Sequence, residues 1–199
     1  MTVYSLFGQA GGGVLQANAG GFTLGMQFSL SQQATLTGIW WYSVPGVTIL
    51  PNQCAVYAVS GQAQVSGSLI TPSWSGAAGS GWVKASYSSG PTLAANTNYV
   101  VAICSPGGGN WFSGTSGYWT TGPGGSGLTS GIITAPNNAA AANGQCPDNF
   151  GSPIAFPATS SAGFNFWVDV EVTVTVPTGG NQQQSGRSMM RKRLMYADV

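Results

Sequence analysis

A strict alternation of apolar and polar side chains near the end of the chain constrains the fold more than any other sequence feature. It runs through FWVDVEVTVTV at residues 166–176. One face collects Phe166, Val168, Val170, Val172, Val174 and Val176, and the other collects Trp167, Asp169, Glu171, Thr173 and Thr175. Because successive side chains of a β-strand point to opposite faces, this period of two predicts a strand with one face against a core.

The same alternation recurs between turns rich in glycine and proline. Apolar faces are formed by Leu24, Met26, Phe28 and Leu30, and by Tyr99, Val101 and Ile103, with further strands expected near residues 3, 36, 54 and 82. Turn-forming residues separate these runs at 11–13, 45–46, 76–81 and 106–109. Seven or more short strands punctuated in this way predict an all-β fold, a single antiparallel β-sandwich of jelly-roll type with a short C-terminal extension.

Charge is scarce and unevenly placed. Charged residues make up 5% of the 199 residues, against roughly 25% in an average soluble domain. Up to residue 180 the only cation is Lys84, set against Asp148, Asp169 and Glu171. A body with this balance lacks the basic surface that nucleic acid requires, so we do not expect nucleic acid among its partners.

The alternation stops after Pro177, which divides the chain into three parts. Residues 1–177 are predicted to form the sandwich, residues 178–186 a polar linker, and residues 187–199 a basic and apolar docking arm that binds another chain. The alternatives for the arm are an idle terminus and a contact with nucleic acid. The residues expected to dock are Arg187, Met189, Met190, Arg191, Lys192, Arg193, Leu194, Met195 and Tyr196.

Aromatic residues in glycine-rich connections form the one constellation that suggests ligand contact. They are Trp111, Phe112, Tyr118 and Trp119. Flat rings on loops can stack on sugar rings, or they can pack against a neighbouring subunit or plug the end of the sandwich. The segment 114–145 beside them is predicted to be a long loop. Loops of this length inside a domain are usually functional or supported by a partner. Strand aromatics such as Trp40, Tyr42, Trp82 and Trp167 are instead expected to pack in the core or against the sheets.

The residue types needed for most catalytic sites are missing. The chain has no histidine, which excludes Ser-His-Asp and Cys-His sites and histidine-ligated metals. Asp169 and Glu171 are expected to lie on the solvated face of their strand. The alternatives are a calcium site built from Asp148, Asp169 and carbonyl groups, and a catalytic pair of carboxylates. The glycine-rich GPGGSG near Gly122 lacks the Lys-Ser/Thr ending of a phosphate-binding loop. We therefore expect no enzyme activity, no metal and no cofactor.

Three cysteines leave at least one thiol outside any disulfide. Cys54 and Cys104 fall in strand-like apolar runs, and no pair has a metal-binding spacing. Buried thiols are the preferred interpretation, and a Cys54–Cys104 bridge is the alternative.

The sequence shows neither an export signal nor a membrane span. The start, MTVYSLFGQAGGG, turns to glycine at once, and no apolar run approaches the roughly 18–20 residues that a span needs. The chain is then either a mature secreted fragment or a protein that leaves its cell by another route, such as lysis. Met1 favours the second, so we expect synthesis in a host cytoplasm without a signal peptide and a place in the virion.

Motifs along the body resemble the family known as domain of unknown function 4082. The likeness runs from about Tyr4 to Val174 and rests on LFG at 6–8, LGMQF at 24–28, TGIWWY at 37–42, VY at 56–57 with Gly61, GW at 81–82, Tyr99, Gly109 with Trp111, FP at 156–157 and NFWVDV at 165–170. The resemblance implies a jelly-roll-like module of bacterial surface proteins and phage particles, with no agreed catalytic residues. The basic tail and the missing export signal depart from the surface proteins of this family.

Together these features favour a phage virion accessory protein, either a minor tail protein or a capsid decoration protein. Its expected partners are other virion proteins, copies of itself and a host cell-surface glycan. The alternative is a carbohydrate-binding module of a secreted bacterial surface protein.

Overall fold

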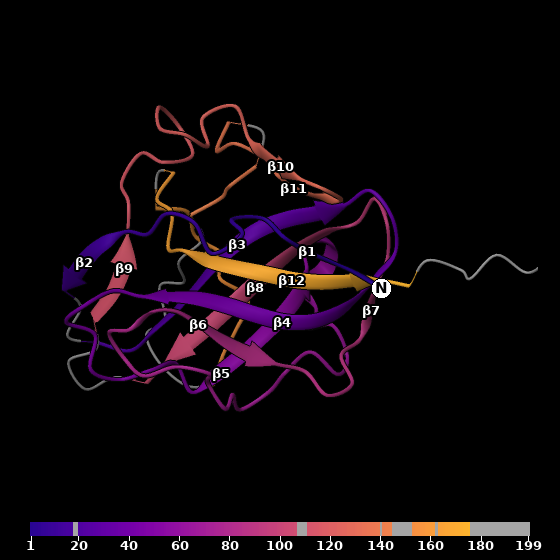
Figure 1. The fold of residues 1–199 in the computed structure, drawn as a ribbon. Helices are drawn as coiled ribbons and strands as arrows, with labels where there is room; N and C mark the ends of the chain where they lie inside the picture. Colours follow the sequence, from indigo (N-terminus) through magenta and orange to yellow (C-terminus); the bar gives the residue numbers. More distant parts are fainter. Residues whose placement is uncertain (18–19, 107–110, 140, 145–152, 162, 176–199) are drawn as a thin grey trace, which may run out of the picture.

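The computed structural model confirms an all-β, antiparallel sandwich (Figure 1). It describes residues 1–17, 20–106, 111–139, 141–144, 153–161 and 163–175. The first sheet, called here the β12 sheet, has the order β1 (Thr2–Ser5), β12 (Val168–Val174), β4 (Ala34–Ser43) and β6 (Gly81–Ser86), with β7 (Thr92–Leu93) also pairing with β4. The second, the β8 sheet, has the order β10 (Leu128–Ser130), β11 (Ile133–Ala135), β3 (Phe22–Leu30), β8 (Asn98–Ser105) and β5 (Gln53–Ala58).

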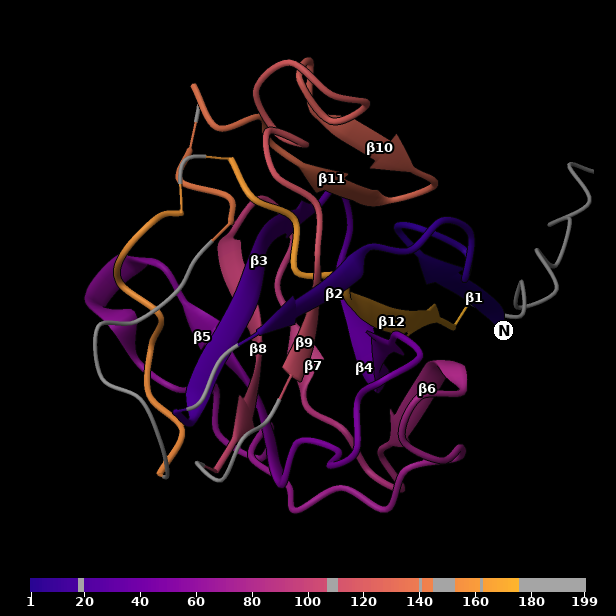
Figure 2. The ribbon, with the colours of Figure 1, turned by 90° about the vertical axis from the view of Figure 1, so that its left-hand side faces the viewer.

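Three further elements lie outside these layers. The strands β2 (Val14–Ala17) and β9 (Trp111–Gly114) pair with each other, and Ser60–Gln62 forms the 3-10 turn η1. Figure 2 shows the main sheets as two layers, with β3, β8 and β5 on one side and β12, β4 and β6 on the other.

The alternating apolar residues build the core between the layers. Val168, Val170 and Val172 of β12 are fully buried, and Trp41 of β4 is among the largest fully buried side chains. They meet Leu24, Met26 and Phe28 from β3 in one continuous cluster. Fully burying side chains of this size stabilises the fold by about 1.5–3 kcal/mol each.

β12 begins two residues later than the alternation predicts. Trp167 has a φ of 55°, a left-handed conformation that a strand cannot contain. The Asn165 side chain accepts a hydrogen bond from the Trp167 backbone N–H at 2.9 Å, which holds this turn. Trp167 is therefore 5% exposed and packs in the core, rather than on the polar face with Asp169.

The segment predicted as a long loop is largely folded on its own chain. Within it, β11 pairs with β3 through Ile133 and Leu30, so the β10–β11 hairpin extends the β8 sheet. Ile133 and Ala135 are fully buried. The prediction of a loop between 114 and 145 is wrong at 128–135, because three-residue strands between glycine turns are too short to show a period.

Cys54 and Cys104 are buried thiols, as predicted, and no disulfide joins them. The register pairs Cys54 with Ile103 and Gln53 with Cys104. Neighbouring positions on a strand point to opposite faces, so Cys54 packs between the sheets and Cys104 on the other side of the β8 sheet. The alternative of a bridge between them is therefore wrong.

Candidate functional site

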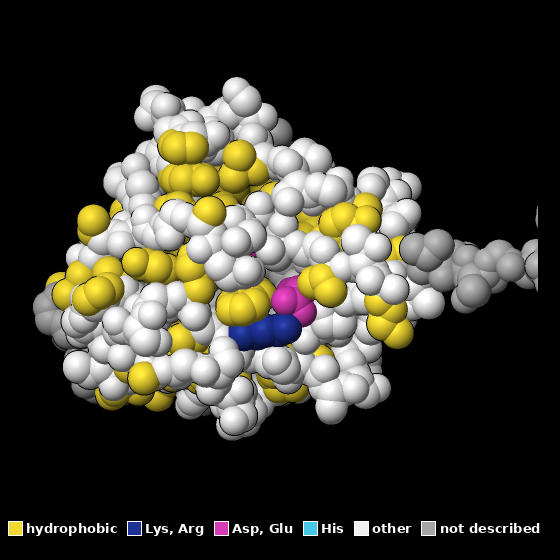
Figure 3. All heavy atoms as spheres, in the orientation of Figure 1, with side chains coloured by type: hydrophobic (Ala, Val, Ile, Leu, Met, Phe, Trp, Pro, Cys, Tyr) yellow, Lys and Arg dark blue, Asp and Glu magenta, His cyan; other side chains and the backbone are white. Residues whose placement is uncertain are grey.

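The outer face of the β12 sheet carries the charged side chains of the described body. Asp169, Glu171 and Thr173 project from β12, because the valines between them point inward. Trp40 lies on β4 and Lys84 on β6. The strand register pairs Trp40 with both Asp169 and Lys84, so the three residues are neighbours across the sheet. Figure 3 shows the lysine and a carboxylate side by side on a face that is otherwise uncharged.

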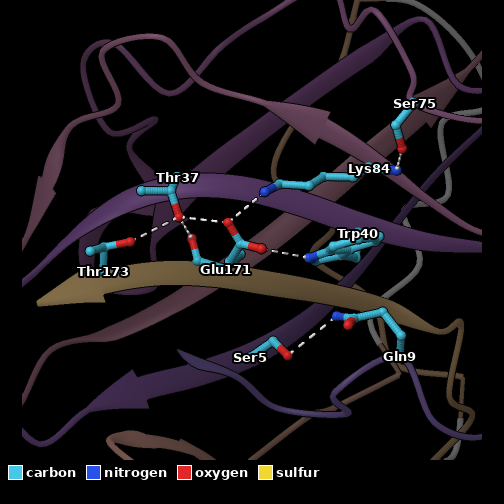
Figure 4. A network of polar contacts seen from close by, with 8 residues as sticks. All are labelled: Ser5, Gln9, Thr37, Trp40, Ser75, Lys84, Glu171 and Thr173. Carbon is cyan, nitrogen blue, oxygen red and sulfur yellow. Dashed lines mark hydrogen bonds and ion pairs between the residues drawn. The ribbon is translucent and has the colours of Figure 1, made fainter. Parts of the chain in front are cut away.

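Glu171 is the centre of the polar network drawn in Figure 4. Its Oε1 accepts hydrogen bonds from Lys84 Nζ at 2.6 Å and from Thr37 Oγ1 at 2.8 Å. Its Oε2 accepts one from Trp40 Nε1 at 3.1 Å. Burial alone would raise the pKa of Glu171, but the bonds from Lys84, Thr37 and Trp40 outweigh it and lower the pKa below its usual value. Glu171 is therefore held as an anion between three donors.

A β-bulge brings Thr37 into this network. The pairing of β4 with β12 shifts between Glu171 and Val172, so that Gly38 faces Glu171 and Leu36 faces Val172. Thr37 is the extra residue of the bulge, and such a residue is re-aimed relative to a regular strand. Its hydroxyl consequently reaches the Glu171 carboxylate.

Asp169 is held by the backbone. Its carboxylate accepts hydrogen bonds from the N–H groups of Leu6 at 3.0 Å, Phe7 at 2.9 Å and Val170 at 2.7 Å. Burial raises the pKa of Asp169 to about 6, the three backbone bonds pull it down, and the nearby Glu171 raises it further. The side chain fixes the segment after β1 over the outer face of β12.

The prediction that Asp169 and Glu171 lie on a solvated face is wrong. Asp169 is 0% exposed and Glu171 is 8% exposed. The covering comes from residues distant in sequence, the segment after β1 for Asp169 and the side chains of Lys84 and Trp40 for Glu171. No periodicity within β12 could have revealed either.

A groove lined with threonines adjoins the Glu171 network. It has a volume of about 210 Å³ and is lined by Met1, Thr35, Thr37, Thr173 and Thr175. The register places Thr35 opposite Thr173 on one side and opposite Thr92 on the other. Thr37 belongs to both the groove and the network, since its Oγ1 also lies 3.4 Å from that of Thr173. The sequence signal for the groove is Thr-x-Thr at 35–37 and at 173–175, and by itself this pattern predicts only strand residues with polar side chains.

The aromatic residues predicted as a contact surface lie mostly inside their own chain. Trp119 is 1% exposed and Tyr118 is 7% exposed, and their rings meet at 4.9 Å. Tyr118 also contacts Trp167 at 5.3 Å. Phe112 is half-buried against Phe22. The structure thus contradicts glycan or subunit contact for Tyr118 and Trp119 and agrees with internal packing, whereas the side chain of Trp111 lies outside the description.

Trp40 behaves differently from the other strand aromatics. Trp167 is in the core, while Tyr42 and Trp82 are half-buried and pack against it. Among the tryptophans whose side chains the structure describes, Trp40 packs against neither buried cluster. Lys84 Nζ lies 5.5 Å from the centre of its ring. Its place is therefore set by polar contacts and not by the core.

Other predictions fall on residues outside the description. These include the linker 178–186, the docking arm 187–199, and Asp148, which the calcium alternative needs. Within the described ranges, no group of three or more His, Cys, Asp or Glu side chains could hold a metal ion. No helix within those ranges is long and apolar enough to cross a membrane.

Comparison with known protein families identifies the family of this chain. The model of the family described as domain of unknown function, DUF4082, matches residues 11–168. No curated protein matches the chain. The matched range runs from just before β2 to the first residue of β12, and so includes the whole β8 sheet and the strands β4, β6 and β7 of the β12 sheet. It covers well over half of the 199 residues, and the chain therefore belongs to the DUF4082 family.

Proposed function

We propose that the protein is a non-enzymatic accessory component of a phage particle, either a minor tail protein or a capsid decoration protein. Its sandwich faces outward and its C-terminal arm, residues 187–199, attaches it to the particle. In this role it presents a stable surface through which the particle contacts its host.

The observation that carries the proposal is the division of charge between body and arm. The charged side chains in the described body are Lys84, Asp169 and Glu171, and all three are engaged within the body. The segment 187–193 holds four cations, with Met189 and Met190 between them. Long-range attraction to an acidic partner depends on charges that are not already neutralised, so here it is a property of the arm.

The state of the two described carboxylates supports a non-enzymatic role. A general acid or base must reach the proton that it transfers. Asp169 is enclosed and binds three backbone N–H groups, and Glu171 binds three side-chain donors. Both therefore serve the fold, by joining β12 to the segment after β1 and to β4 and β6.

The direct test is the location of the full-length protein during phage production. Particles are separated from soluble protein and cell envelopes on a density gradient, and the protein is quantified in each fraction by mass spectrometry. We expect it to sediment with particles at a fixed ratio to the major capsid protein. Recovery only with soluble protein or with cell envelopes would contradict the proposal.

A second arm of this experiment tests the absence of enzyme activity. A variant with Asp169→Asn, which leaves Glu171 and its hydrogen bond with Trp40 in place, should assemble and leave particle infectivity unchanged. Loss of infectivity in a variant that still folds and assembles would assign a functional role to Asp169 and contradict this expectation.

A further inference from the structure

Trp40 is a large apolar side chain that the fold does not use for its core. It is half-buried and packs against neither apolar cluster. Its indole N–H donates to Glu171, and Lys84 Nζ lies over the ring. An indole in this setting is fixed in orientation, and a ligand that stacks on it need not pay the cost of ordering a loose side chain.

The threonine groove lies beside Trp40 and offers a second surface that the same ligand can contact. Threonine carries a hydroxyl and a methyl group on one carbon, so the four threonines Thr35, Thr37, Thr173 and Thr175 line the groove with both kinds of group. Trp40 and Thr37 bind the two oxygens of the same carboxylate. The ring and the groove are therefore neighbouring parts of one surface.

We propose that this surface, formed by Trp40, Lys84 and the threonine groove, binds a neutral saccharide. This proposal extends the proposed function by naming the class of ligand. Only its biological use rests on that function, because saccharide binding is a property of the isolated protein.

The chemistry of a sugar ring fits each part of the surface. One face of a hexose presents C–H groups with slight positive charge, which favour the negative face of an indole. Its hydroxyls can exchange hydrogen bonds with the threonines, and Lys84 has further N–H donors beyond the one given to Glu171. Few polar groups beside an apolar surface are typical of small-ligand sites.

The balance of charge favours a neutral sugar over an acidic one. Lys84 and Glu171 form an ion pair at 2.6 Å, and their side chains are 22% and 11% exposed. The positive charge of Lys84 is therefore already neutralised, and a carboxylated sugar would also meet the Glu171 anion. Like charges at short range disfavour binding.

The test uses the purified full chain and a printed panel of oligosaccharides. Neutral hexose and N-acetylhexosamine oligomers are the expected ligands, and sialylated and uronic acid oligomers are the acidic comparators. Titration calorimetry with the best neutral member then gives the dissociation constant. Trp40→Ala should weaken binding about tenfold, as loss of a stacking aromatic does at other sites. Trp40→Phe, which keeps a ring, should stay within about threefold of the wild type.

A second pair of variants tests the threonine groove without changing Trp40. Thr35→Val deletes a groove hydroxyl with little change of shape and should weaken binding about threefold, the usual effect of one lost hydrogen bond. Thr134→Val is the matched control, because Thr134 is exposed on the β10–β11 hairpin and should leave binding unchanged. Circular dichroism confirms that each variant is folded.

Three binding results would overturn the proposal. They are the absence of binding to every neutral oligosaccharide, binding of acidic members alone, and binding that Trp40→Ala and Thr35→Val leave unchanged. A dimer that Trp40→Ala converts to a monomer would assign the surface to a second copy of the chain, and so would also overturn it. Because none of these assays involves particles, failure here leaves the gradient test of the proposed function unaffected.

Discussion

Asp169 and Glu171 stand two residues apart on β12, yet their environments move their pKa values in opposite directions. Burial dominates at Asp169 and raises its pKa, whereas donors from Lys84, Thr37 and Trp40 lower that of Glu171. The sequence correctly predicts that both side chains point away from the core. It could not predict their burial, because the covering atoms belong to residues 6–7, 40 and 84.

Asp169 gives the body a predictable dependence on pH. Its pKa rises from an ordinary 3.8 to about 6 on folding, so between these values the folded state binds more protons than the unfolded state. The contribution of this group to the free energy of unfolding is therefore complete below about pH 4 and is lost as the pH rises through about 6, by about 3 kcal/mol in total.

Urea unfolding of the wild type and of Asp169→Asn at several pH values measures this term. The asparagine keeps the oxygen that serves Leu6 and Val170 and cannot ionise. The wild type should lose stability relative to the variant from pH 4 to pH 6. A difference that stays constant, or that changes in favour of the wild type as the pH rises, would contradict the account.

Gly11 is a residue whose role depends on contact as well as on backbone angle. Its φ is 75°, and a Cβ added there would lie 2.7 Å from the ring of Trp167. Gly8 has a φ of 59° but nothing within 4 Å of such an atom. Gly8→Ala should therefore cost only the left-handed strain of about 1–2 kcal/mol, while Gly11→Ala should cost about 1–3 kcal/mol more from the clash.

Thermal or urea unfolding compares the two alanine variants directly. The matched pair separates backbone strain from packing, because both glycines precede β2 and only one touches Trp167. Equal losses of stability in the two variants would show that the Trp167 ring moves to accommodate the added methyl group. Packing would then not require glycine at position 11.

At the scale of elements, long strands are predictable and short ones are not. The alternation indicates β3, β4, β8 and β12, whose lengths of seven to ten residues contain several periods. The strands β10 and β11 have three residues each and lie between glycine turns. The pairing of β11 with β3 is a tertiary contact, so the sequence alone suggested a long loop that is functional or supported by a partner.

The hairpin is expected to be part of the cooperative core. Ile133 is fully buried and pairs with Leu30, so Ile133→Ala should lower the free energy of unfolding by about 2–5 kcal/mol. Thr134→Ala on the same strand is exposed and should change it by less than about 0.5 kcal/mol. Equal, small effects in urea unfolding would mean that the hairpin is only loosely attached to the sandwich.

At the scale of the whole molecule, the fold class followed from the sequence and the surface chemistry did not. Two sheets, their antiparallel pairing and the buried thiols agree with prediction. The Glu171 network and the threonine groove arise where β1, β12, β4 and β6 meet, and this meeting depends on strand order and on a bulge. The order of strands is not encoded in any single run of residues, so the site became visible only in three dimensions.

The central claim is that the arm, and not the sandwich, attaches the protein to a particle. The decisive measurement is the particle occupancy of a variant that lacks residues 181–199, determined by quantitative mass spectrometry of gradient-purified particles. The variant should unfold at the same urea concentration as the full chain, because both sheets lie within residues 1–175. Changing Arg187, Arg191, Lys192 and Arg193 to glutamine should reduce occupancy and its sensitivity to salt. We predict that occupancy of the truncated protein falls to background, and full occupancy would place the anchor in the sandwich and contradict the account.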